Sequence, residues 1–312
     1  MKLYANNSPH ISGKEKTHDI MLDVIIALAP LGIAGTIFFG FRALLVIAVC
    51  VASAVIGEYL FNKAIKKETT IKDLSAVVTG LLLAYNLPST IPLWIAALGS
   101  LIAVVIVKGM FGGLGQNFAN PAITARIVLM VSFPTLMSSF APVFSNTTVV
   151  SSATPIKEIG LTYGSFGGEY SMLRLFLGDY AGCIGETSAL LILLGGIYLV
   201  LRKVISPIIP LSFIGTTFLF TFILSGNFKL SVAAVLCGGV MLGAVFMATD
   251  YVTSPTSNLG KLIFGVGAGI ITVLIRSFGN LPEGVSYSIL LMNLFTPLIE
   301  KIPSRKPFFE EA

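Results

Sequence analysis

Charged residues are scarce in this sequence. Asp, Glu, Lys and Arg make up 11% of the 312 residues, whereas about a quarter of the residues in a soluble domain are charged. The three cysteines are far apart and have no CxxC spacing, which argues against a disulfide framework or a cysteine-only iron–sulfur site. Hydrophobic residues make up 55% of the sequence, and the mean hydropathy is +0.90. The composition therefore predicts an integral membrane protein.

Apolar runs long enough to cross a hydrocarbon core of about 30 Å recur along nearly the whole chain. They predict an all-α protein with ten membrane spans, at about 22–40, 43–61, 74–88, 92–108, 120–137, 183–201, 208–225, 230–248, 260–276 and 284–300. The third and ninth spans are expected to be short. The predicted organisation is an N-terminal segment (1–21), a first transmembrane half (22–137), a loop (138–182), a second transmembrane half (183–300) and a tail (301–312). The first twenty or so residues are polar and lack a signal peptide's apolar core, so the first helix is expected to be retained.

The basic residues predict how the chain is oriented. If the N-terminus is cytoplasmic, five of the 20 Lys and Arg (Arg42, Lys157, Arg174, Lys229 and Arg276) fall outside and the other fifteen fall inside. The positive-inside rule then places both termini in the cytoplasm and the loop 138–182 on the outer side. Because the basic residues are spread over short loops, the net charge of +5 does not indicate a nucleic-acid partner.

The two halves contain similar segments. "TGLLLAYNLPST" (79–90) precedes an apolar run that ends in "VVIVKG", and "LGAVFMATDYVTSPT" (242–256) precedes one that ends in "TVLIRS". In the predicted topology the first copy enters its turn outside and the second inside, which is the pattern of an inverted repeat. Such interrupted segments commonly line a site near the membrane interior. The alternative is that apolar runs look alike by chance.

Two kinds of polar residue within the apolar sequence are candidates for function. "GGLGQNFANPAITARI" (112–127) is rich in glycine and places the amides of Asn117 and Asn120 before a helix start at Pro121. Taken alone, this segment also fits an ordinary loop with a helix N-cap.

Carboxylates in or beside spans are costly and are therefore candidates for ion coupling. These carboxylates are Asp23, Glu58, Glu186 and Asp250. For Asp250 and Glu186, helix or turn capping is the alternative.

The segment "NTTVVSSATPIKEIG" (146–160) is a hydroxyl-rich stretch within the predicted outer loop. Proline keeps the preceding residue out of the helical region, so Thr154 is expected to be extended and to present its hydroxyl. A cluster of Ser and Thr is also typical of a solvated turn. The residues alone leave both interpretations open.

Several long strings resemble the NqrB/RnfD family, which includes the RnfD subunit of the Rnf complex and the NqrB subunit of the sodium-pumping NADH:quinone oxidoreductase. They include "TGLLLAYNLPSTIPLWIAALG", "KGMFGGLGQNFANPAITAR", "GETSALLILLGG" and "GAVFMATDYVTSP". The resemblance implies FMN joined through its phosphate to the threonine of a motif Asp-x-x-Ser/Thr-Gly-Ala-Thr, attached by a flavin transferase that uses FAD. In that register Thr154 is the attachment residue and Ser151 and Ala153 belong to the motif. Ser152 and Thr148 depart from it, which puts recognition by the transferase in doubt.

The resemblance also implies a function. Some family members bind a second, non-covalent flavin (riboflavin), for which Asn117, Asn120 and Pro121 are the expected residues. The chain is expected to be a membrane subunit of a ferredoxin:NAD+ oxidoreductase that exports Na+ or H+, working with RnfA, RnfB, RnfC, RnfE and RnfG in the cell inner membrane. The short N-terminal segment favours Rnf over the quinone-reducing relative. An alternative of another class is a solute channel, because the inverted repeat resembles the architecture of urea transporters.

Overall fold

The computed structural model describes residues 17–67, 70–141, 143, 172–279 and 284–302, and these residues form helices and no strands. The helices of the first half are α1 (Thr17–Phe39), α2 (Phe41–Ala64), α3 (Ser75–Tyr85), α4 (Leu93–Leu101), α5 (Pro121–Ser132) and α6 (Pro134–Met137), with the 3-10 helix η1 (Ile71–Asp73) and the π-helix η2 (Ile102–Gly109). The later helices are α8 (Met172–Leu177), α9 (Ala189–Leu201), α10 (Ile208–Ser225), α11 (Phe228–Leu236), α12 (Val240–Leu242), the π-helix η3 (Gly243–Met247), α13 (Asn258–Phe278) and α14 (Val285–Ile299). The prediction of an all-α membrane protein is confirmed.

Helix lengths distinguish full membrane crossings from shorter segments. Four described helices, α1, α2, α10 and α13, are long and apolar enough to cross a membrane. A fifth crossing is possible through α11 followed by α12 and η3, which are bent by 60° at their break. The other apolar helices (α3, α4 with η2, α5, α9 and α14) have 10–17 residues. Each predicted span therefore coincides with a helix or helix pair, but half of them are shorter than the roughly 20 residues of a straight crossing.

The predictions of short spans were half right. Helix α3 has 11 residues, as expected for the third span. Helix α13 has 21 residues, so the prediction of a short ninth span was wrong. It begins two residues before the predicted start because Ser257 caps it, accepting a hydrogen bond from Gly260 N at 3.0 Å. Most residues of the predicted loop 138–182, namely 142 and 144–171, lie outside the described residues.

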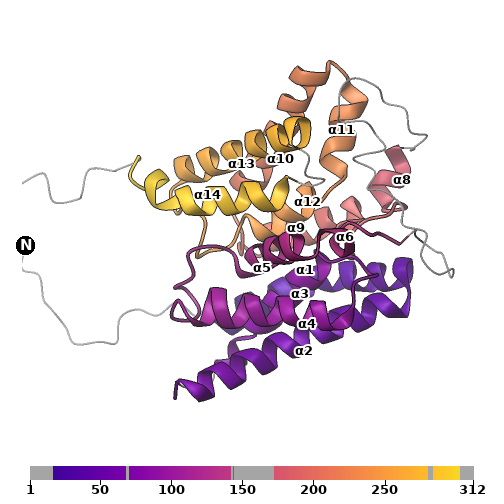
Figure 1. The fold of residues 1–312 in the computed structure, drawn as a ribbon. Helices are drawn as coiled ribbons and strands as arrows, with labels where there is room; N and C mark the ends of the chain where they lie inside the picture. The colour runs from indigo at the N-terminus through magenta and orange to yellow at the C-terminus, as the bar shows by residue number, and fades with distance from the viewer. Residues whose placement is uncertain (1–16, 68–69, 142, 144–171, 280–283, 303–312) are drawn as a thin grey trace, which may run out of the picture.

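The two halves pack their helices in a similar order. Helix α2 packs against α3 and α4 in the first half, and α10 packs against α11 and α13 in the second. Helix α1 contacts α9, and α5 contacts α14, so elements in equivalent positions of the two halves meet each other. Figure 1 shows the first half, from indigo to magenta, lying below the orange and yellow second half. This arrangement supports the internal repeat, whose inversion across the membrane stays a prediction.

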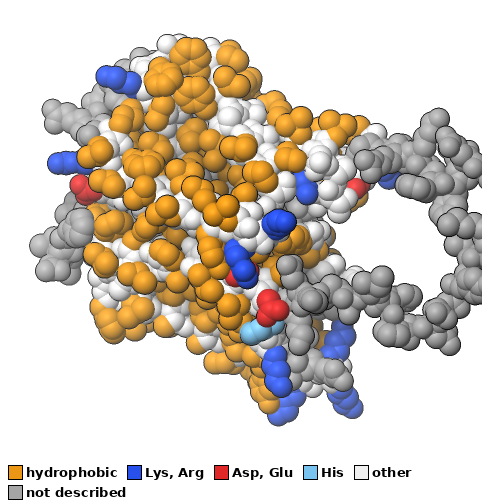
Figure 2. Space-filling view, turned by 180° about the vertical axis from the view of Figure 1, so that it is seen from behind, with side chains coloured by type: hydrophobic (Ala, Val, Ile, Leu, Met, Phe, Trp, Pro, Cys, Tyr) orange, Lys and Arg blue, Asp and Glu red, His pale blue; other side chains and the backbone are white. Residues whose placement is uncertain are grey.

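The outer surface is mostly apolar. In Figure 2 hydrophobic side chains cover the middle of the visible face, while Lys and Arg lie mainly toward its left edge and its right-hand part. Large side chains such as Trp94, Leu211 and Ile223 are more than half exposed. Exposed apolar area of this extent marks a surface that contacts lipid or partner subunits rather than water.

Candidate functional site

A cavity of about 100 Å³ lies where the two halves meet. Its walls come from the start of α1, from α3, from the segment that leads into α5, from the end of α9 and from the residues around η3. Both π-helices contribute to it, Lys108 from η2 and Phe246 from η3. π-Helical segments are rare and are frequent at functional sites.

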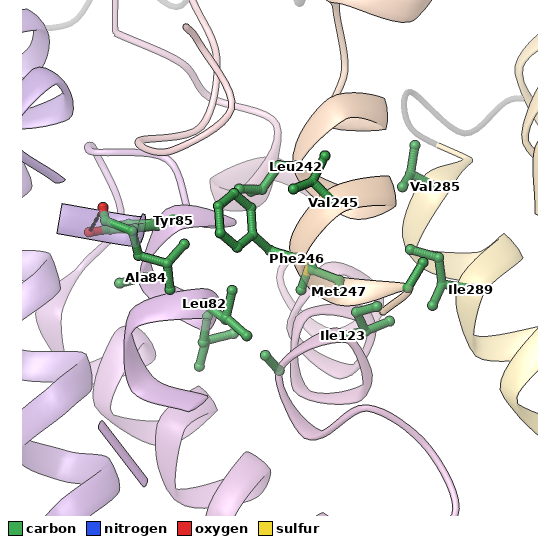
Figure 3. Close-up of a cluster of buried hydrophobic side chains, with 14 of the residues drawn as sticks. Leu82, Ala84, Tyr85, Ile123, Leu242, Val245, Phe246, Met247, Val285 and Ile289 are labelled. Atoms are coloured by element: carbon green, nitrogen blue, oxygen red, sulfur yellow. Dashed lines mark hydrogen bonds between the residues drawn. The ribbon is translucent and has the colours of Figure 1, made fainter. Parts of the chain in front are cut away.

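Apolar side chains form much of the wall. Leu82 of α3 and Phe246 of η3 line the cavity and belong to the main core. Figure 3 shows these residues in a cluster to which Ile123 of α5 and Ile289 of α14 also contribute. Leu82 belongs to the first half and Phe246 to the second, so core side chains of both halves form part of the cavity wall. Such a wall suits the flat, apolar surface of an aromatic ligand.

The predicted flavin residues Asn117, Asn120 and Pro121 all line this cavity. Asn120 is the N-cap of α5, because its Oδ1 accepts hydrogen bonds from Ala122 N at 3.0 Å and Ile123 N at 3.3 Å. Its Nδ2 donates to Met247 O at 3.2 Å, which ties α5 to η3. The capping interpretation is therefore correct for Asn120. Its polar atoms are engaged by the protein, so its role at the cavity is to fix the wall.

Asn117 is the more available of the two amides. It is buried, and its Nδ2 donates to Ala119 O at 3.0 Å. Its Oδ1 accepts no hydrogen bond from the part of the chain that the structure describes, which leaves a carbonyl acceptor at the cavity wall. An acceptor in this position can bind water or a ligand in the cavity.

Asp250 lines the same cavity, in the turn that follows η3. Val252 N and Thr253 Oγ1 donate to its carboxylate at 3.5 and 3.1 Å, so the predicted turn-capping role is also present. Burial raises the pKa of the Asp250 carboxyl above its ordinary value, and these two hydrogen bonds oppose the increase. A carboxyl with these properties can exchange a proton or hold a cation beside the cavity.

Glu58 is connected to the cavity by Lys108. From the sequence alone, Lys108 contributes only to the prediction of topology. Lys108 Nζ forms an ion pair with Glu58 Oε2 at 3.0 Å, and both side chains are buried. Lys108 itself lines the cavity. The sequence repeat could have indicated that Lys108 is important, because "VVIVKG" and "TVLIRS" place Lys108 and Arg276 at equivalent positions. Arg276 is likewise buried, where it donates to Ala234 O at 2.6 Å.

The other two candidate carboxylates lie away from the cavity. Asp23 accepts a hydrogen bond from Tyr198 at 2.8 Å and pairs with Arg202 at 3.0 Å, so it joins α1 to the end of α9. Glu186 Oε1 accepts from Cys183 N at 3.0 Å in the segment before α9. Neither lines the cavity, and the four carboxylates predicted for ion coupling therefore do not form one site.

Glu186 belongs to a second buried polar cluster, around Arg126 of α5. Arg126 Nη1 donates to Asn86 Oδ1 at 2.6 Å, and Nη2 contacts Cys183 Sγ at 3.6 Å. A Cβ added to Gly239 would lie 3.0 Å from Glu186 Oε2 and 3.9 Å from Arg126 Nη1, and the φ of Gly239 is +73°. Arg126 is thus held in the protein interior. Gly239 gives this cluster its space at the break between α11 and α12.

The residues predicted to carry the covalent flavin, Ser151, Ala153 and Thr154, lie outside the described residues. Within the described part, no group of three or more His, Cys, Asp or Glu side chains could hold a metal ion.

Comparison with known proteins identifies the family to which this sequence belongs. A model of the NQR2, RnfD, RnfE family matches residues 4–308. The chain belongs to this family. It is 47% identical over 309 residues to the D subunit of the Na+-translocating ferredoxin:NAD+ oxidoreductase complex of Acetobacterium woodii, covering 98% of this chain and 95% of that protein. It is 44% identical over 307 residues to the D subunit of the proton-translocating ferredoxin:NAD+ oxidoreductase complex of Clostridium ljungdahlii, covering 95% and 93%.

A third relative is more distant but equally complete. The D subunit of the ion-translocating oxidoreductase complex of Escherichia coli is 37% identical over 335 residues, covering 94% of this chain and 95% of that protein. The family membership inferred from the motifs is confirmed, and the relatives are named as D subunits of oxidoreductase complexes. The names of the two more similar relatives specify different ions, Na+ in one and the proton in the other.

Proposed function

We propose that this chain is the RnfD subunit of an Rnf-type ferredoxin:NAD+ oxidoreductase and couples electron transfer to Na+ or H+ export. The observation that carries the proposal is the cavity between the halves, where Asn117 and Pro121 of the first half face Phe246 and Asp250 of the second. The same function is supported by matches, over almost their entire length, to two D subunits of ferredoxin:NAD+ oxidoreductase complexes and to the D subunit of an ion-translocating oxidoreductase complex. RnfA, RnfB, RnfC, RnfE and RnfG are the expected partners.

The residues that line the cavity suit a non-covalent flavin, and the cavity of about 100 Å³ would widen around the ring system on binding. Leu82 and Phe246 offer apolar surface to a planar ring system, and Asn117 Oδ1 offers an acceptor to an N–H group. Lys108 brings a positive charge to the cavity wall, which would favour the negative charge of a reduced flavin. When bound, the flavin supplies one- and two-electron redox chemistry, and the protein's part is to hold and orient it.

We assign the covalent FMN to Thr154 through a phosphoester, with attachment by a flavin transferase. The support is the motif alone, in which the Thr154 hydroxyl and its neighbour Ala153 are kept. In the proposed orientation both termini are cytoplasmic and the flavin loop faces outward, because fifteen of the 20 basic residues then lie inside. For ion coupling, Asp250 and Glu58 are the favoured carboxylates because one lines the cavity and the other pairs with a lining residue.

The quinone-reducing relative and a solute channel are the competing functions. Flavin distinguishes the channel, because a channel of this architecture has no need of a redox group. The test uses membranes from cells that also express the transferase. Wild type should fluoresce in a denaturing gel and support ferredoxin-driven NAD+ reduction, and Thr154→Ala should lose both. Ser151→Ala is the matched control and should keep the fluorescence. A wild-type chain without fluorescence, or a fluorescent Thr154→Ala chain, would overturn the assignment.

A further inference from the structure

A buried ion pair lies behind one wall of the cavity. Lys108 is 3% exposed and Glu58 is 5% exposed. Lys108 Nζ donates to both carboxylate oxygens of Glu58, at 3.0 and 3.2 Å, and to Ser75 Oγ at 2.6 Å. Lys108 and Ser75 line the cavity, whereas Glu58 does not. The ammonium group therefore connects the cavity wall to a carboxylate that the cavity does not reach.

The ammonium group is shared between two acidic networks. On one side Glu58 also accepts a hydrogen bond from Thr70 Oγ1, to which Asn62 Nδ2 donates at 3.1 Å. On the other side Ser75 Oγ donates to Asp73 Oδ1 at 2.6 Å. All three hydrogens of Lys108 are thus used, and its charge is divided between Glu58 and the start of α3.

The backbone around this pair is irregular in two places. Lys108 lies in the π-helix η2, which shifts its side chain relative to a regular helix. Leu74, directly before Ser75, has φ +62°, in the left-handed region that is costly for a branched side chain. Strained conformations persist where the surrounding structure fixes them and are common at switches and ligand sites. Both irregularities lie beside the contact between Lys108 and Ser75.

We propose that Lys108 is a positioning residue that links the charge of the ligand in the cavity to cation binding at Glu58. Negative charge added to the cavity attracts the ammonium and weakens its hold on Glu58. A buried carboxylate that loses its partner must recover a positive charge, because an unpaired charge is expensive in the interior. Glu58 then binds one cation, Na+ or a proton, for each electron that reaches the cavity, and the net charge of the region is restored.

This inference rests on the proposed flavin in the cavity, with electrons supplied through the partner subunits. The simpler role for the pair is to hold α2 against α3 and η2. The two roles differ in what they predict for the ligand. A structural pair affects stability only, whereas a linking pair makes the reduction potential of the ligand depend on cation concentration.

The experiment is a spectroelectrochemical titration of the non-covalent flavin in the purified complex at several pH values and Na+ concentrations. The variants are Lys108→Gln, Lys108→Arg, Glu58→Gln and the double variant Glu58→Gln/Lys108→Gln, in which no buried charge is left alone. Lys67→Gln is the matched control, because Lys67 is an exposed lysine that donates to Gly112 O at 3.3 Å, in the segment that follows η2.

The wild-type potential should change with pH or Na+ concentration, and Lys67→Gln should behave like wild type. Lys108→Gln should favour the oxidised form at least tenfold, which is about 59 mV for a one-electron couple. It should also lose the cation dependence, as should Glu58→Gln and the double variant, whereas Lys108→Arg should retain it. A redox-induced infrared band of a carboxyl group should be present in wild type and absent from Glu58→Gln.

The outcomes separate the two levels of the proposal. If acid extraction of the wild-type complex releases no flavin, the proposed flavin site is wrong and the inference falls with it. If flavin is present and Lys108→Gln keeps both the wild-type potential and its cation dependence, the link through Lys108 is wrong and the flavin site stands. If the double variant alone assembles, retention of cation dependence in it equally overturns the link.

Discussion

Gly185 lies where the segment before α9 crosses the end of α3, and Gly185→Ala should strongly destabilise the protein. Its N–H donates to Tyr85 O at 2.9 Å, and an added Cβ would lie 2.3 Å from Tyr85 Cβ and 2.6 Å from Cγ. Tyr85 cannot turn away, because its hydroxyl donates to Leu28 O at 3.0 Å and packs against Gly32. Relief therefore requires backbone movement. Overpacking costs about 1–3 kcal/mol, and the contact with Cβ indicates the upper end, about a hundredfold in the folding equilibrium.

The three buried free cysteines make this measurable. A thiol-reactive fluorophore in detergent solution reports their exposure as the protein is heated. Gly185→Ala should lower the midpoint by several degrees. Gly215→Ala is the control, since nothing lies within 4 Å of its added Cβ and alanine is favoured over glycine within a helix by about 0.5–1 kcal/mol. Identical midpoints for the two variants would refute the packing argument.

Three further predictions concern Asn120 and Asp250, which line the cavity, and Asp23, which does not. Asn120→Ala should lower the free energy of unfolding by about 2 kcal/mol, because it removes both the cap of α5 and the hydrogen bond to Met247 O. A thermal unfolding midpoint equal to that of wild type would contradict this. Asp23→Asn should cost no more than about 1 kcal/mol and leave ion export intact, because the side chain of its partner Arg202 is 57% exposed; abolished export would place Asp23 in the ion path. Asp250 has a native pKa raised above 3.8, so its stabilising contribution is complete at low pH and is lost as pH rises. Asp250→Asn should therefore gain stability over wild type as pH rises from about 4, measured by thermal unfolding across pH, and a constant difference would exclude this titration.

Local features of the fold could be predicted from the sequence. The apolar runs locate all the main helices, because burial in lipid demands both apolar side chains and internally bonded backbone. The helix start at Asn120 and Pro121 follows from capping chemistry alone. The repeated strings correctly indicate that α3 and the α12–η3 segment have related places in the two halves.

The convergence of distant residues could not be predicted from local pattern. Glu58 and Lys108 are fifty positions apart, and nothing in either segment states that the two will pair beside the cavity. Asp23 resembles Asp250 as a carboxylate at a span edge, yet it pairs with Arg202 outside the cavity. Arg126 donates to Asn86, forty positions away, and this contact likewise depends on tertiary packing.

Mass spectrometry of the peptide that spans residues 149–157 tests the central claim most directly. The protein should be purified with its complex from cells that express the flavin transferase, digested, and fragmented to locate any modification. The account predicts an FMN adduct on Thr154 and an unmodified peptide from Thr154→Ala. An adduct on Ser151 or Ser152, or an unmodified wild-type peptide, would contradict it.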